Sequence, residues 1–90
     1  MNDELAGAEA TELALREQIS DLVHARARAD SEAARLADRA SLAGAHDELA
    51  EIAGRYERQS RTLAEEIETL RTSLRAAEAD LERLRAPAGD

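Results

Sequence analysis

Apolar residues recur every three to four positions along most of the chain, which is the spacing of helices that pack through one face. In the second half a heptad repeat runs without interruption, and Leu and Ile occupy most of its a and d positions. The first half has its own repeat, in which Ala is more frequent. Because a and d residues of two helices pack against each other, we call these positions the seam. Besides Leu5, the large seam residues are Leu15, Ile19, Leu22, Leu36, Leu49, Tyr56, Leu63, Ile67, Leu70, Leu74, Leu81 and Leu84.

The two repeats are out of phase, and the break coincides with signals for a turn. Continuing the first repeat would place its next a position at Asp47, whereas the second repeat begins at His46. Gly44 follows the last seam position of the first repeat, where glycine commonly ends a helix. Asp47 is a suitable N-cap for the next helix. We therefore expect a single coiled-coil domain over residues 1–90, with a first arm at about 3–43, a turn at 44–46, a second arm at about 47–86 and a frayed tail at 87–90.

This break predicts an all-α fold, an antiparallel two-helix coiled-coil hairpin. With the arms antiparallel, the flanking e positions pair Glu9 with Arg85 and Arg16 with Glu78, so that opposite charges meet. The alternative is one continuous helix in a parallel coiled-coil dimer. In that arrangement Glu12, at an a position, would face its own copy, which favours the hairpin.

Composition supports long helices and excludes several kinds of chemistry. Aromatic residues make up 1% of the chain, with Tyr56 the only one, and there are 21 alanines. Such a composition is typical of coiled coils and not of sheets. The absence of Cys excludes disulfides and thiolate metal sites. No HExxH motif or glycine-rich phosphate loop is present, so we expect no catalytic residues, no metal site, no cofactor and no enzymatic activity.

The charge of the chain limits its partners. The formal net charge is −8, and all twelve basic residues are Arg. A strongly negative chain is poorly suited to nucleic acid or to anionic membranes. No apolar run approaches the ~18 residues of a membrane span, so membrane insertion is not expected. Residues 1–4 are acidic and lack the apolar segment of a signal peptide, which predicts a cytoplasmic protein.

Four large apolar residues, Leu13, Val23, Leu42 and Ile52, lie outside the seam. A two-helix seam also leaves its own side chains partly exposed, so the hairpin buries little apolar area. We therefore expect a non-enzymatic scaffold or adaptor that acts through helix–helix contacts. Its partners would be other proteins or a second copy, with a homodimer that forms a four-helix bundle as the simplest assembly.

The predicted turn carries an acidic tip, which we define as His46, Asp47 and Glu48. The sequence around it is similar to the tip of the N-terminal hairpin of Gre-type transcript-cleavage factors, which reads roughly Gly-Asp-Leu-x-Glu-Asn-Ala-Glu-Tyr. Ala45 and Ile52 stand where that family has Asp and Tyr. The resemblance implies a regulator that inserts the tip into the secondary channel of RNA polymerase, where the family's acidic residues hold a metal ion. The matching residues are Gly44, Glu48, Ala50 and Glu51.

A second resemblance is to the secreted Trp-x-Gly helical hairpins, which are acidic and of similar length. Leu42, Ala43 and Gly44 stand at the place of the motif, with Leu in place of Trp. Ser60 follows Tyr56 at the position where the export signal of that family has an acidic residue. This resemblance implies a small secreted helical hairpin.

Overall fold

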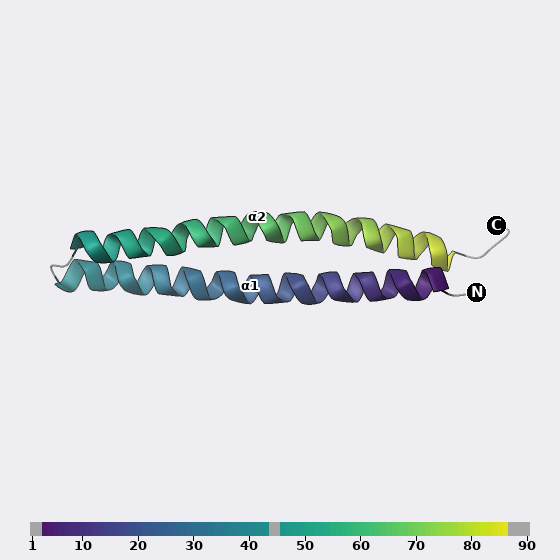
Figure 1. Cartoon of the computed structure of the whole chain (residues 1–90), viewed down its shortest axis with the longest axis horizontal. Helices are drawn as coiled ribbons and strands as arrows, with labels where there is room; N and C mark the ends of the chain where they lie inside the picture. Colours follow the sequence, from purple (N-terminus) through teal and green to yellow (C-terminus); the bar gives the residue numbers. More distant parts are fainter. Residues whose placement is uncertain (1–2, 44–45, 87–90) are drawn as a thin grey trace.

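The computed structural model describes residues 3–43 and 46–86, and these ranges form two long helices that lie side by side (Figure 1). Helix α1 spans Asp3–Ala43 and helix α2 spans His46–Arg85. The helices run in opposite directions, and the molecule measures 71 × 15 × 13 Å. The predicted all-α hairpin is therefore confirmed, and the alternative of one continuous helix is wrong.

The start of α2 differs slightly from the sequence prediction. The helix begins at His46, so His46 is helical and does not belong to the turn, and Asp47 lies in the first turn instead of capping it. Residues 44–45 of the predicted turn lie outside the described residues. Asp47 and Glu48 still face the positive end of the helix dipole, which stabilises carboxylates at this position. This difference of one residue is small, because the ends of a helix are defined only within one or two residues.

The other end of α2 combines a charge effect with a local hydrogen bond. Arg83 and Arg85 lie in its last turn, where the dipole favours cations. The Ala86 N–H donates a hydrogen bond to the Arg83 carbonyl at 3.3 Å just beyond the helix. The predicted tail at residues 87–90 lies outside the described part of the chain.

The core is a single row of side chains between the two helices. Small residues dominate the row in the half of the hairpin near the turn. Because Ala stands at facing positions there, the two backbones can approach closely. Leu81, at 1% exposure, is the largest side chain that is fully buried among the described residues. The buried residues are Ala29, Ala33, Ala40, Ala53, Ser60, Ile67 and Leu81.

One polar contact interrupts the row. Ser60 is 6% exposed, and its hydroxyl accepts a hydrogen bond from Arg26 Nε at 3.4 Å. Arg26 Nε also lies 4.0 Å from Asp30 Oδ2. Within the described residues no buried side-chain polar atom lacks a hydrogen-bond partner, so this contact satisfies the buried hydroxyl.

Two ion pairs between the helices fix how the helices are aligned. Arg85 Nη2 donates to Glu9 Oε2 at 2.8 Å, and Arg16 Nη2 donates to Glu78 Oε2 at 2.7 Å. Both pairs were predicted from the antiparallel pairing of e positions, and both are confirmed. Arg16 also lies 3.4 Å from Glu12, so one guanidinium joins two carboxylates.

Candidate interaction surfaces

The predicted seam residues lie along the contact between α1 and α2. Ile67 and Leu81 are buried, whereas the other large seam residues are half-buried. Apart from Leu81, the leucines of the row therefore keep part of their surface in contact with solvent. Among the seam positions whose burial the structure describes, only Arg26 is clearly exposed, and its long side chain reaches past the row toward water. The half-buried seam residues are Leu15, Ile19, Leu22, Leu36, Leu49, Tyr56, Leu63, Leu70, Leu74 and Leu84.

The acidic tip lies at the end of the rod away from both chain termini (Figure 1). Asp47 and Glu48 are exposed, and His46 is the first residue of α2. Over the residues that the structure describes, no group of three His, Asp or Glu side chains is arranged to hold a metal ion. Neither helix, within its described bounds, has an apolar stretch long enough to cross a membrane.

The four large apolar residues outside the seam are all solvent-exposed. Leu42 is the most exposed, at 87%, followed by Leu13 at 58%. Val23 and Ile52 are 39% and 38% exposed. Leu42 and Ile52 lie near the turn, whereas Leu13 lies in the half that holds the termini. These exposed side chains are available for contact with another helix.

Two flanks of the hairpin lie beside the seam, on opposite sides of it. We name the first the ion-pair flank, because it carries the Glu9–Arg85 and Arg16–Glu78 pairs. Gln18 lies two residues after Arg16, and two residues turn a helix by about 200°, so Gln18 is on the other side. Gln18 and Glu66 line one depression together, and we name this side the groove flank.

The groove flank has a shallow depression in the middle of the rod, which we call the groove. Its residues come from both helices, with Leu22 and Leu70 as its apolar part and Asp21 and Glu66 as its carboxylates. Among the described residues neither of these carboxylates forms an ion pair. Apolar side chains and negatively charged carboxylates therefore lie together in the groove. The groove is lined by Gln18, Asp21, Leu22, Glu66 and Leu70.

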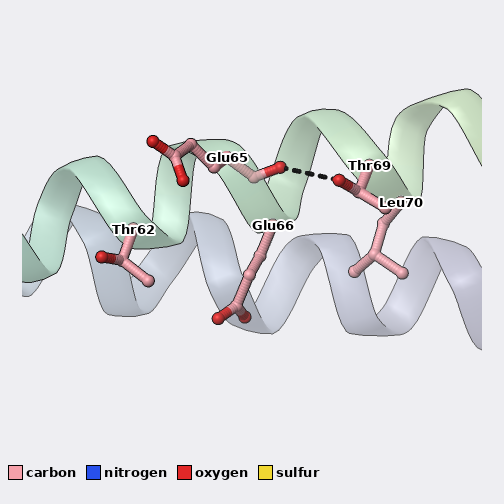
Figure 2. Close-up of a pocket in the computed structure, with 5 residues that line it drawn as sticks. All are labelled: Thr62, Glu65, Glu66, Thr69 and Leu70. Atoms are coloured by element: carbon pink, nitrogen blue, oxygen red, sulfur yellow. Dashed lines mark hydrogen bonds between the residues drawn. The ribbon is translucent and has the colours of Figure 1, made fainter.

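A second depression adjoins the groove on α2 (Figure 2). Figure 2 shows Glu66 and Leu70 extending toward α1, whereas Glu65 and Thr69 point away from it. The Thr69 hydroxyl donates a hydrogen bond to the Glu65 backbone carbonyl at 3.1 Å. This bond lies within α2 and does not involve the Glu65 carboxylate. Glu66 and Leu70 line both depressions, so the apolar and acidic surface continues along α2.

The groove was not identified from the sequence. Its residues were visible there as Leu22 and Leu70 at seam positions, with Gln18 and Glu66 at the two facing g positions. The available signal is that these two g positions do not carry opposite charges. The facing e positions of the ion-pair flank do carry them. The two g positions therefore leave the adjacent leucines without a covering ion pair.

Comparisons with known proteins add no assignment to these surfaces. No protein family model matches the chain, and no curated protein or solved structure shows a significant similarity to it.

Proposed function

We propose that this protein is a non-enzymatic scaffold or adaptor that acts through helix–helix contacts with partner proteins and with a second copy of itself. The observation that carries the proposal is the exposure of large apolar side chains on a rigid, narrow rod. Leu42 is 87% exposed, and most large seam residues are only half-buried. Covering these side chains with another helix would stabilise both molecules by removing apolar area from water.

The charge distribution supports a protein partner. A net charge of −8 disfavours contact with phosphate backbones and anionic lipids, whereas it is compatible with a helix that presents Arg or Lys beside leucines. The exposed apolar residues are separated along the rod by charged ones, so a partner helix would meet both kinds of side chain. Homodimerisation of two hairpins into a four-helix bundle is part of the proposal.

An affinity capture with matched variants tests the scaffold function. The tagged full chain is incubated with native lysate, and the captured proteins are compared with those of two variants. The first variant replaces the four exposed apolar residues, and the second carries Asp47→Ala and Glu48→Ala. We expect capture to be lost in the first variant and retained in the second. The first variant is Leu13→Ser, Val23→Ser, Leu42→Ser and Ile52→Ser.

The second candidate function is a regulator of RNA polymerase that acts through the acidic tip. It is supported by the position of Asp47 and Glu48, exposed at the far end of a 71 Å rod. Recovery of RNA polymerase in the same capture, lost on replacing Asp47 and Glu48 by Ala, would favour this function over the scaffold. Capture that is insensitive to all the exposed apolar residues would also contradict the scaffold.

A cytoplasmic location completes the proposal. Fractionation of native cells tests it, with the tagged chain expected in the cytoplasmic fraction. Accumulation in the culture medium would contradict it and would favour the secreted helical hairpin.

A further inference from the structure

We propose that two copies pair antiparallel through their groove flanks, with an apolar patch near the turn of each copy seated over the groove of the other. The patch, which we call the turn patch, consists of Leu42 and Ile52 with the neighbouring Arg39 and Arg55. This inference rests on the proposed homodimer, and it adds the surface, the orientation and the stagger of the two copies.

The turn patch and the groove lie on the same side of the hairpin. Ile52 precedes Glu66 by two heptads, so the two residues are in the same row along α2. Arg39 follows Gln18 by three heptads and is in the corresponding row of α1. Leu42 lies three residues beyond Arg39, which makes it a neighbour of Arg39 on the helix surface. A two-fold dimer requires that one surface carries both complementary parts, and the groove flank does so.

The two parts are complementary in charge as well as in polarity. The groove surrounds Leu22 and Leu70 with the carboxylates of Asp21 and Glu66. The turn patch places Arg39 and Arg55 within one helical turn of two exposed apolar side chains, in the half of the hairpin that carries no net charge. Arg39 forms no ion pair with any described residue, and Arg55 is held only by an exposed pair with Glu51 at 3.3 Å. An Arg in this position can move to a carboxylate of the second copy at little cost.

The distribution of charge along the rod favours the antiparallel orientation. Residues 26–61, which form the half of the hairpin near the turn, contain seven Arg and seven acidic residues. The remaining residues, which form the half with the termini, contain five Arg and thirteen acidic residues. All of the net charge of −8 therefore lies in that half. A parallel pair would place the two negative halves together, whereas an antiparallel pair places each against a neutral half.

The positions of the two parts also determine the stagger. Along α1 the turn patch lies about 20 residues from the groove, or about 30 Å at the helical rise. The two-fold axis then passes near residue 30, beyond the middle of the helix. The negative ends of the two copies extend past the overlap in opposite directions. The dimer should be about 20 Å longer than one hairpin, which measures 71 Å.

Charge reversal in two separate variants tests this arrangement. One variant carries Arg39→Glu and Arg55→Glu, so that its turn patch and its groove are both negative. The other carries Asp21→Arg and Glu66→Arg, so that both are positive. Sedimentation equilibrium should show that each variant alone dimerises about tenfold more weakly than the wild type. An equimolar mixture should regain wild-type dimerisation as a heterodimer, because each turn patch then meets a groove of opposite charge.

Two further substitutions locate the surface independently of these charges. Leu42→Arg should weaken the wild-type dimer, whereas Leu13→Arg, at an exposed leucine beside the ion-pair flank, should leave it unchanged. Circular dichroism checks that each variant remains helical. Any of three results would overturn this surface. They are dimerisation that is unchanged by the charge reversals, a mixture that does not restore dimerisation, and equal effects of Leu13→Arg and Leu42→Arg. A wild-type chain that stays monomeric would overturn the homodimer itself, whereas the capture experiment reports on other protein partners separately.

Discussion

At the scale of single residues, burial in this hairpin is concentrated in very few large side chains. Leu81 is 1% exposed and Ile67 is 3% exposed, whereas the leucines around them remain half-buried. The contribution of a side chain to stability depends on how completely it is removed from water. Leu81 therefore contributes more than its neighbours in the same row.

Replacement of Leu81 by Ala should lower the free energy of unfolding by about 2–4 kcal/mol, because it removes a fully buried side chain and leaves a cavity. Leu13→Ala, at an exposed leucine of the same hairpin, should change it by less than about 0.5 kcal/mol. Urea unfolding followed by circular dichroism, at one protein concentration, measures both. Equal effects of the two substitutions would contradict the burial of Leu81.

The contact between Arg26 and Ser60 gives a second prediction at this scale. Arg26→Leu combined with Ser60→Ala should raise the free energy of unfolding by about 1 kcal/mol, because both polar partners are replaced by apolar groups. Arg26→Leu alone should give a smaller gain, because the Ser60 hydroxyl then stays buried without its partner. Thermal unfolding of the three chains orders them. A double variant less stable than the wild type would show that the contact stabilises the fold.

At the scale of elements, the two ion pairs of the ion-pair flank contribute to the alignment of α1 and α2 that the seam determines. Arg16→Glu should destabilise the hairpin by about 0.5–1 kcal/mol, because it places two carboxylates together at Glu78. Adding Glu78→Arg should recover most of this loss. The two single variants and the double variant form a double-mutant cycle, measured by chemical unfolding at low salt. Additive effects would mean that the pair contributes nothing.

The antiparallel packing itself can be fixed covalently. Cys introduced at Glu12 and Ala77, two half-buried seam positions that face each other in the predicted pairing, should form a disulfide within one chain on oxidation at high dilution. Non-reducing electrophoresis and mass spectrometry identify the product. Helical chains that form only disulfides between molecules would contradict the hairpin.

The sequence was sufficient to predict the hairpin because the two seven-residue repeats determine the helices and their contact faces, and the break in phase between them determines the turn. The pairs Glu9–Arg85 and Arg16–Glu78 and the exposure of Leu13 and Leu42 all follow from these repeats. The start of α2 at His46 did not, since helix ends differ little in free energy over one residue. The groove depends on how deeply Leu22 and Leu70 are buried between the helices. This depth is a property of packing, and the order of residues along the chain does not predict it.

At the scale of the whole molecule, self-association links stability to concentration. A dimer that forms only from folded hairpins should raise the midpoint of thermal unfolding as the protein concentration increases. Calorimetry of the wild-type chain over a hundredfold range of concentration measures this shift. The Leu42→Arg variant should show a smaller shift, and a midpoint that does not move with concentration would contradict the homodimer.

The start of α1 and the end of α2 lie at the same end of the rod, held together there by the Glu9–Arg85 pair (Figure 1). A pulling force applied between the two chain ends would therefore act across the seam and open it one layer at a time, beginning beside Leu84. The same force applied between the turn and one end would act along a helix and load many layers at once. The hairpin should therefore resist a force along one helix better than a force between its two chain ends. A force transmitted through both chain ends would separate α1 and α2 progressively from that end of the rod.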